Sequence, residues 1–420
     1  MPAYHIWTIG CQMNKAESDR LAGRLEEQGY TAVDSPAEAD IIILNSCVVR
    51  QSAENRIVNK IYSLRPFRKA NPGVLLAVTG CFVGEDTAGL KKRYPYIDHF
   101  FPAGSNPPWL DEPVSPPLPA VVKPVEYLSI SQGCNNFCTY CIVPYRRGRE
   151  RSKPFREIIC EARELANRGV KEITLLGQNV DSYGQDLPER PDLADLLTEL
   201  NDIPGLARLR FLTNHPKDMS DRLIDAISRL DKVCEHVNLP VQAGSDAVLH
   251  DMGRGYTAAD YLRLVEKLRT AVPDIALSTD IIVGFPGETA DRFRETYDLI
   301  AAVNFDTVHV AIYSAREGTA AARHLEDDVT AEEKKERLTA IEDLQEGIQT
   351  AINARLSGTT QEILVEGKNR GKWYGRTRTD KLVFFKEKSD LTGKLMNIVI
   401  EKTSPWSLQG SIPPTTEEEK

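Results

Sequence analysis

Residues 133–141 read GCNNFCTYC and place Cys134, Cys138 and Cys141 in the spacing C-x3-C-x2-C. A loop that wraps an iron–sulfur cluster needs several thiolates a few residues apart. Three ligands would leave one iron with an open coordination position, which catalytic metal sites keep for substrate or cofactor. The alternatives are a chance grouping or a structural zinc site, but zinc prefers four ligands in paired spacings and no matching pair follows. We therefore interpret this stretch as a cluster loop with one open iron.

Length and composition limit the class of protein. The 420 residues, 41% of them hydrophobic, predict two to three domains with buried cores. No apolar run reaches the length of about 18 residues that a membrane span needs, and the N-terminus lacks the pattern of a signal peptide. We expect a cytoplasmic protein, in which 8 cysteines indicate metal binding or catalysis before disulfides. With a net charge of −9, a nucleic-acid partner would need a local basic surface.

Strand and helix patterns alternate in the first hundred residues. Apolar strands are predicted at 5–9, 41–45 and 74–79, and a helical pattern such as 54–67 follows each of them. This order predicts an α/β fold that begins with a doubly wound parallel sheet.

A cysteine follows each of these three strands: Cys11, Cys47 and Cys81. Parallel strands deliver the residues just beyond their carboxyl ends to one edge of the sheet, where such folds place their sites. The alternative is three buried core cysteines, which are common, but core residues would lie within the strands. We predict that these three cysteines form a second cluster site.

A proline-rich segment at 102–124 predicts a linker and a domain boundary. After it the strand–helix pattern repeats six times, which predicts a partial (β/α)6 barrel with its site at the C-terminal ends of the strands. The expected strands are 125–131, 171–177, 207–213, 236–242, 275–284 and 307–314, and the expected helices are 156–168, 191–201, 218–230, 258–271 and 289–302. The cysteines of 133–141 follow the first strand and so fall at the mouth of this barrel.

The chain changes character at about residue 354. Short strands at 363–365, 382–385 and 395–400 predict a small β-barrel. Eleven Lys and Arg stand against six Asp and Glu here, in a chain that is acidic as a whole. Basic residues neutralise phosphates and aromatic rings stack on bases, so this segment predicts RNA contacts by Arg370, Lys372, Trp373, Arg376 and Arg378. The alternative is an ordinary solvated β-surface. We expect the tail, 415–420, to be disordered.

The cysteine motif and partial barrel resemble the radical S-adenosylmethionine (SAM) superfamily. The three N-terminal cysteines and the basic β-domain narrow the resemblance to its methylthiotransferases. The stretches that carry it are GCQMN at 10–14, YCIVPY at 140–145, ITLLGQNV at 173–180, LPVQAGS at 239–245 and TDIIVGFPGET at 279–289. Gln12 and Met13 are typical of the MiaB-type branch, which acts on prenylated adenosine of tRNA. The residues beside Cys47 and Cys81 depart slightly from the commonest family wording, and the cysteines themselves are intact.

The resemblance implies a transferase with two 4Fe–4S clusters that uses SAM and binds tRNA. It implies an N-terminal methylthiotransferase domain at 3–115, a radical SAM core at 116–353 and a TRAM domain at 354–414. The implied reaction adds sulfur and a methyl group to carbon 2 of N6-dimethylallyladenosine at position 37, beside the anticodon, and consumes two SAM. It implies a reductant such as flavodoxin or ferredoxin. We expect a monomer that does not contact membranes.

The candidate SAM contacts follow or lie in the barrel strands. They are Gly177, Gln178, Gln242, Ser245, Arg254 and Asp280. A guanidinium fork suits a carboxylate, so Arg254 is the candidate for that group of SAM; each of the six residues has the alternative of a polar group that closes the barrel top. A basic segment after the cluster loop is a candidate for tRNA, SAM or plain solvent contact: Arg146, Arg147, Arg149, Arg151, Lys153 and Arg156. Cys160 and Cys234 are assigned no role.

Other functions remain compatible with parts of the pattern. Related branches act on threonylcarbamoyl-adenosine of tRNA or on a ribosomal protein. A different class would be a non-enzymatic iron–sulfur electron carrier or RNA-binding regulator. The open-iron motif favours an enzyme, because a carrier would fill all four ligand positions.

Overall fold

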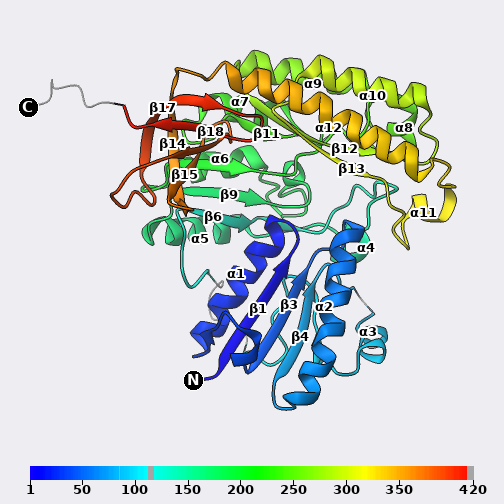
Figure 1. Cartoon of the computed structure of the whole chain (residues 1–420), viewed down its shortest axis with the longest axis vertical. Coiled ribbons are helices and arrows are strands. Elements are labelled where there is room, and N and C mark those ends of the chain that lie inside the picture. Colours follow the sequence, from blue (N-terminus) through cyan, green and yellow to red (C-terminus); the bar gives the residue numbers. More distant parts are fainter. Residues whose placement is uncertain (85, 112–117, 414–420) are drawn as a thin grey trace, which may run out of the picture.

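A computed structural model of the chain describes residues 1–84, 86–111 and 118–413 (Figure 1). A five-stranded parallel sheet, two three-stranded parallel sheets and a closed β-barrel follow one another along the chain. The predicted fold class is confirmed. The boundary expected at 115/116 and the tail at 415–420 lie outside the described residues. Within those residues, no helix has the length and apolar content to cross a membrane.

The N-terminal sheet has the strand order β2-β1-β3-β4-β5 and is parallel throughout. Its elements are β1 (Ala3–Ile9), α1 (Gln12–Glu27), β2 (Thr31–Ala32), η1 (Pro36–Glu38), β3 (Ile41–Ser46), α2 (Gln51–Ala70), β4 (Leu75–Gly80), α3 (Thr87–Arg93) and β5 (His99–Phe100). Alternate residues of β3 face opposite sides, because side chains alternate along a strand. Ile43 packs with Leu25 of α1, and Ile42 packs with Ile61 of α2. The helices therefore cover both faces, as a doubly wound sheet requires.

Six parallel strands form the central region in the orders β10-β9-β6 and β11-β12-β13. An isolated parallel bridge between Leu209 and Val233 lies where the two sheets adjoin. The strands are β6 (Val125–Ser129), β9 (Glu172–Leu176), β10 (Arg208–Phe211), β11 (His236–Asn238), β12 (Ala276–Val283) and β13 (Thr307–Ile312), and the helices between them are α5 (Phe155–Asn167), α6 (Leu193–Asn201), α7 (Asp221–Arg229), α9 (Ala258–Ala271) and α10 (Ala290–Val303). Each predicted strand and helix is found. The fourth strand is shorter than predicted, since Pro240 has no N–H to donate to a ladder.

In the central region, several shorter elements and one long helix were not predicted. They are β7 (Ser131–Gln132), α4 (Val143–Arg147), β8 (Arg151–Ser152), η2 (Val180–Ser182), α8 (Asp246–Asp251), α11 (Ala320–His324) and α12 (Ala331–Ala354). Thr330 and Glu333 form a capping box at the start of α12, which is a signal that the sequence carries. The helix contacts both β13 and the C-terminal barrel.

The C-terminal barrel closes in the order β14-β15-β16-β18-β17. Its strands are β14 (Thr360–Asn369), β15 (Lys372–Thr377), β16 (Leu382–Phe385), β17 (Leu395–Thr403) and β18 (Leu408–Ser411). The three predicted strands lie within β14, β16 and β17. The stretch read as a basic RNA-binding segment includes a further strand, β15. In Figure 1 this barrel lies beside the amino-terminal ends of β6 and β9.

Candidate iron–sulfur centres and RNA-facing cavity

Three neighbouring strands of the N-terminal sheet end level with one another and bring three cysteines together. The amide N of Cys47 donates to the Ile9 carbonyl at 2.9 Å, and the amide N of Cys81 donates to the Ser46 carbonyl at 2.7 Å. Cys11 follows β1 after Gly10 and directly precedes α1. The topology thus gathers Cys11, Cys47 and Cys81 at the carboxyl edge of the sheet, at the point where successive helices change face.

Glycines before two of these cysteines permit the close approach. Gly10 has φ of +142°, and a Cβ there would lie 2.5 Å from the Cβ of Cys47. Gly80 has φ of +86°, and a Cβ would lie 2.4 Å from the Ser46 carbonyl oxygen. A larger residue at either position would push the strand ends apart.

The three thiols interact electrostatically. A hydrogen bond with Cys47 lowers the pKa of Cys11 to about 6. A hydrogen bond with Cys47, aided by the charge of Arg147, lowers the pKa of Cys81. The same two bonds raise the pKa of Cys47. Two thiols therefore favour the thiolate form that binds metals.

The 133–141 loop places the second triplet between β7 and α4. A turn is closed by the Cys141 amide, which donates to the Cys138 carbonyl at 2.9 Å. The loop is anchored to the barrel by the Thr139 amide, which donates to the Met252 carbonyl at 3.0 Å. Phe137 has φ of +47°, a conformation that non-glycine residues adopt at a cost and that concentrates at functional sites. Burial raises the pKa of Cys141 to about 12 and also raises that of Cys134.

A buried arginine donates to one sulfur in each triplet. Arg147 Nε lies 3.0 Å from Cys81 Sγ, and Arg254 Nη1 lies 3.4 Å from Cys138 Sγ. Arg254 also donates to the Pro240 carbonyl at 2.8 Å and from Nε to the Tyr256 hydroxyl at 2.9 Å. An arginine has five N–H groups, more than these bonds use, which leaves donors for the SAM carboxylate. That contact stays a prediction.

Four more of the predicted SAM contacts lie at the ends of barrel strands. Gln178 follows β9, and its Oε1 accepts from the Gly133 amide at 2.5 Å, which ties this strand end to the cluster loop. A Cβ on Gly177 would lie 2.5 Å from Ser131 Oγ. Gln242 has φ of +74° and pairs through its backbone with β12. Ser245 is buried at the start of α8. These positions agree with the expected mouth, and their roles toward SAM stay predictions.

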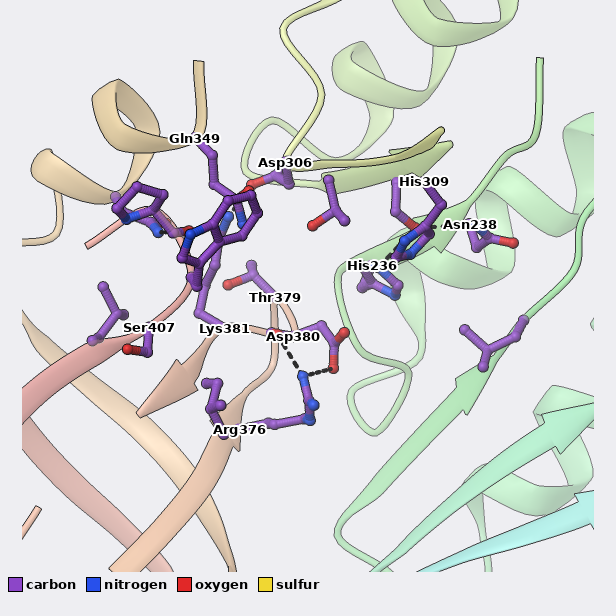
Figure 2. Close-up of a pocket in the computed structure, with 18 of the residues that line it drawn as sticks. His236, Asn238, Asp306, His309, Gln349, Arg376, Thr379, Asp380, Lys381 and Ser407 are labelled. Atoms are coloured by element: carbon purple, nitrogen blue, oxygen red, sulfur yellow. Dashed lines mark hydrogen bonds and ion pairs between the residues drawn. The ribbon is translucent and has the colours of Figure 1, made fainter. Parts of the chain in front are cut away.

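Asp280 faces a different space, a cavity of about 500 Å³ between the central strands and the C-terminal barrel. Figure 2 shows His236 and Asn238 on one wall and Arg376 and Lys381 on the other. Burial lowers the pKa of His236 to about 4. The lining combines residues of all three regions, including Gln12, Thr213, Asn238, Asp280, Lys381 and Trp406. Gln12 is the chain neighbour of Cys11, so the cavity links the C-terminal barrel with the N-terminal triplet.

The predicted RNA contacts separate into two groups. Trp373 is only 5% exposed, and its Nε1 donates to the Glu387 carbonyl at 3.0 Å inside the barrel. The expectation that it stacks on a base is wrong, because period-2 alternation in β15 turns it into the core. Arg378 is held by Glu235, with Nη2–Oε1 at 2.7 Å, and joins the barrel to the central region.

The other three basic residues keep exposed surface. Arg370 is exposed in the turn between β14 and β15, and Lys372 Nζ lies 3.2 Å from Gln409 Oε1. Arg376 lines the cavity and pairs with Asp380 at 3.3 Å. Sequence reasoning missed Trp406, which is 63% exposed and lines the same cavity. Its signal was an aromatic in a Ser-Pro-Trp-Ser turn between two strands.

The two cysteine triplets fit an iron–sulfur cluster better than a single metal ion. Among the residues that the structure describes, no group of three or more His, Cys, Asp or Glu side chains forms a site for a single metal ion. A 4Fe–4S cluster is bound by thiolates that each contact a different iron, so its ligands need not converge on one point. Two sets of three thiols, each with a buried arginine against one sulfur, suit such clusters by their chemistry.

Three family models match successive parts of the chain. They are the uncharacterized protein family UPF0004 at residues 3–102, the radical SAM superfamily at 128–300 and the TRAM domain at 354–412. Each matches one of the regions described above.

Curated relatives are similar over almost the whole length. A tRNA-2-methylthio-N(6)-dimethylallyladenosine synthase of Dehalococcoides mccartyi (strain ATCC BAA-2266 / KCTC 15142 / 195) is 52% identical over 412 residues, 98% of this chain and 99% of the relative. One of the same name from Chloroflexus aurantiacus is 49% identical over 97% of this chain and 91% of the relative. Among solved structures, the radical S-adenosylmethionine methyltransferase TsrM from Kitasatospora setae has a TM-score of 0.54 at 13% identity, covering 87% of this chain and 78% of that one. That similarity shows the fold alone.

Proposed function

Since the chain belongs to the family of tRNA-2-methylthio-N(6)-dimethylallyladenosine synthases, we propose that it methylthiolates carbon 2 of N6-dimethylallyladenosine at position 37 of tRNA, beside the anticodon. As a radical SAM enzyme, it uses a 4Fe–4S cluster and SAM. The observation that carries the proposal is the presence of two three-cysteine sets in one chain, each at the carboxyl edge of parallel strands.

Each triplet is proposed to hold one 4Fe–4S cluster. Cys134, Cys138 and Cys141 would hold the cluster that binds SAM, and a set of three leaves one iron open for it. Cys11, Cys47 and Cys81 would hold the second. The level strand ends support this assignment, because they bring the three N-terminal thiols to one edge of the sheet.

Side chains of this chain would bind and orient the reactants. When bound, the two clusters supply one-electron cleavage of SAM, hydrogen abstraction from an unactivated carbon, and the inserted sulfur, none of which a side chain performs. Gln178 holds the cluster loop through Gly133, and we assign Gly177, Gln242, Ser245 and Arg254 to SAM at the barrel mouth.

The substrate adenosine is proposed to enter the cavity shown in Figure 2. Asn238 and Asp280 supply polar groups on the central strands, joined by a 3.3 Å hydrogen bond. Arg370 and Lys372 would contact phosphates outside it. In this assignment the RNA lies along the C-terminal barrel, and the base that reacts points toward Gln12. We further propose a cytoplasmic monomer that receives electrons from a protein such as flavodoxin or ferredoxin.

Nucleoside mass spectrometry tests the proposed function. The protein, reconstituted anaerobically, is given SAM, a reductant and an anticodon stem-loop that carries N6-dimethylallyladenosine. We expect 2-methylthio-N6-dimethylallyladenosine to form. Parallel reactions use a stem-loop with threonylcarbamoyl-adenosine and a ribosomal-protein extract. Product only in one of those reactions would move the chain to another branch, and 5′-deoxyadenosine with no product in any would contradict a methylthiotransferase.

Trp406 provides a test of the RNA-facing cavity. The turn that carries it is held by Asn353 of α12, whose Nδ2 donates to the Ser404 and Pro405 carbonyls at 2.8 and 3.0 Å. Stacking of a base on an aromatic ring contributes about 1–3 kcal/mol. We expect Trp406→Ala to weaken binding of the stem-loop by that amount and Trp406→Phe to retain most of it, measured by fluorescence anisotropy. Leu395→Ala, an exposed apolar control on the same barrel, should bind normally; equal losses in both variants would contradict a base contact.

A further inference from the structure

Arg147 connects the two cysteine triplets. It is the last residue of α4, the short helix that follows Cys141, and its side chain is only 2% exposed. In Figure 1 the strands β1, β3 and β4 point toward α4. The Arg147 side chain extends from α4 to Cys81 at the carboxyl edge of the N-terminal sheet, where the guanidinium Nε lies 3.0 Å from Sγ. The expectation of a solvated or tRNA-contacting side chain does not hold for this member of the basic segment.

Glu17 fixes the other side of the guanidinium. Its carboxylate accepts from Nη1 at 2.5 Å and from Nη2 at 3.3 Å. Glu17 lies on α1, the helix that begins directly after Cys11. A carboxylate and a guanidinium paired in this two-bonded way are held in a defined orientation, so Nε–H is directed at the sulfur. The contact therefore joins Glu17, from the helix after Cys11, to Arg147, from the helix after Cys141.

We propose that Arg147 is a positioning residue that sets the reduction potential of the cluster held by Cys11, Cys47 and Cys81. It also ties the position of that cluster to the loop that would hold the SAM-binding cluster. The inference rests on the proposed second cluster. An N–H donor and a positive charge beside a ligand sulfur stabilise the reduced state, which carries one more negative charge, and so raise the potential. Burial strengthens this effect, because few water molecules screen the charge.

A second arginine also joins the N-terminal and central regions, and it serves as a control for a purely structural role. Arg20, also on α1, crosses to α5 through Glu161, with Nη2–Oε2 at 2.6 Å, and the Glu161 side chain is 3% exposed. Among the residues that the structure describes, no cysteine is a hydrogen-bond partner of Arg20. If Arg147 acted only by joining regions, Arg20→Met and Arg147→Met would change the same properties. If it acts on the sulfur, only the Arg147 variant changes the potential.

The experiment uses the full chain with Cys134, Cys138 and Cys141 all replaced by Ala, so that iron reports the second cluster alone. Iron is counted, and the midpoint potential is found by redox titration followed by electron paramagnetic resonance. We expect Arg147→Met to shift the equilibrium at least about tenfold toward the oxidised cluster, which corresponds to about 59 mV for one electron. Arg147→Lys should shift it less, because the charge remains, and Arg20→Met should not shift it.

The outcomes separate the two proposals. A background chain without iron would overturn the second cluster and this inference with it. Full iron with an unchanged midpoint in Arg147→Met would overturn only the role of Arg147. If Arg147→Met fails to hold iron, Arg147→Lys decides: a lowered midpoint supports the inference, and the midpoint of the background chain overturns it.

Discussion

Cys47→Ala is expected to keep cleaving SAM to 5′-deoxyadenosine and to lose methylthiolated product below detection. Cys47 is the central cysteine of its triplet, since it follows β3, which pairs with both β1 and β4. Its removal takes away one ligand of the proposed second cluster. Cys134, Cys138 and Cys141 lie on a separate loop anchored to the barrel, so cleavage of SAM should persist. Chromatography of 5′-deoxyadenosine and mass spectrometry of the RNA measure the two outcomes in one reaction.

Cys160→Ala is the matched control for this result. Cys160 is exposed on α5, and the sequence assigned it no role. Its variant should make both products at the rate of the unmodified chain. Iron counting adds a second reading, with about eight irons per chain expected for two 4Fe–4S clusters and about four in Cys47→Ala. Full product formation by Cys47→Ala would contradict the role of this triplet.

Arg210→Met is expected to lower the free energy of unfolding by about 3–5 kcal/mol, the usual effect of breaking a buried ion pair. Arg210 Nε lies 2.8 Å from Glu172 Oε1, and both side chains are at most 4% exposed. The same guanidinium donates to the carbonyls of Thr377 and Arg378 at 2.6 and 2.7 Å. The substitution leaves a buried carboxylate with one distant partner, Arg208 at 3.9 Å. It also removes bonds that hold the C-terminal barrel, so RNA binding should weaken. Urea unfolding followed by circular dichroism measures the stability.

Arg222→Met serves as the comparison for a surface ion pair. Arg222 bonds Asp192 and Asp195 with its side chain 64% exposed. Such pairs contribute at most about 1 kcal/mol, so this variant should unfold near the midpoint of the unmodified chain. Equal midpoints for the Arg210 and Arg222 variants would contradict the structural role of the buried pair.

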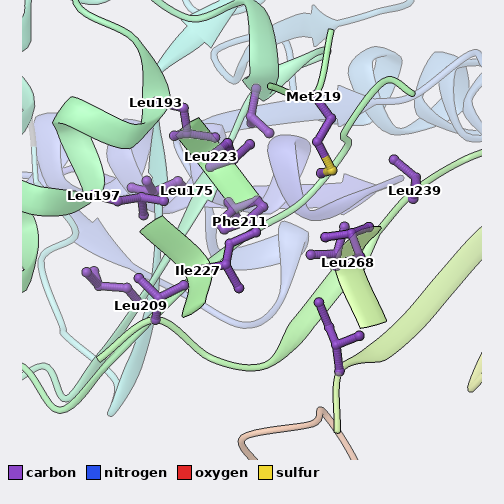
Figure 3. Packing of buried hydrophobic residues seen from close by; sticks show 14 of the residues in the cluster. Leu175, Leu193, Leu197, Leu209, Phe211, Met219, Leu223, Ile227, Leu239 and Leu268 are labelled. Carbon is purple, nitrogen blue, oxygen red and sulfur yellow. The ribbon is translucent and has the colours of Figure 1, made fainter. Parts of the chain in front are cut away.

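Apolar periodicity made most of the fold predictable. The helix spacing of Leu193 and Leu197 and that of Leu223 and Ile227 mark one face of α6 and of α7. Figure 3 shows these faces meeting Leu175, Leu209 and Phe211 of the central strands. That Cys11, Cys47 and Cys81 lie together was predicted from the topology of a parallel sheet, because they are too far apart in sequence to form a local motif. The strands β15 and β18 were missed because Gly375 and Gly410 interrupt short strands whose pairing is set by barrel closure.

Side-chain partners distant in sequence could not be predicted in the same way. Trp373 and Trp406 both stand in polar surroundings in the sequence, yet one is 5% and the other 63% exposed. Which face of a strand turns inward depends on its register with neighbours, and a shift of one residue reverses it. That Asp280 lines the cavity toward the C-terminal barrel likewise could not be read from its place in a predicted strand, and its contact with SAM stays a prediction.

The amino-acid sequence by itself determined the cluster loop at 133–141, the three cysteines after successive strands, and the order of the three regions. Such features depend on short windows, in which spacing and periodicity act directly on the local backbone. Only the tertiary structure decided that Arg147 contacts Cys81, 66 positions away in the chain, and is held there by Glu17. That contact exists because the N-terminal region packs against the central region, with α1 in contact with β6, and this packing depends on the whole chain rather than on either segment.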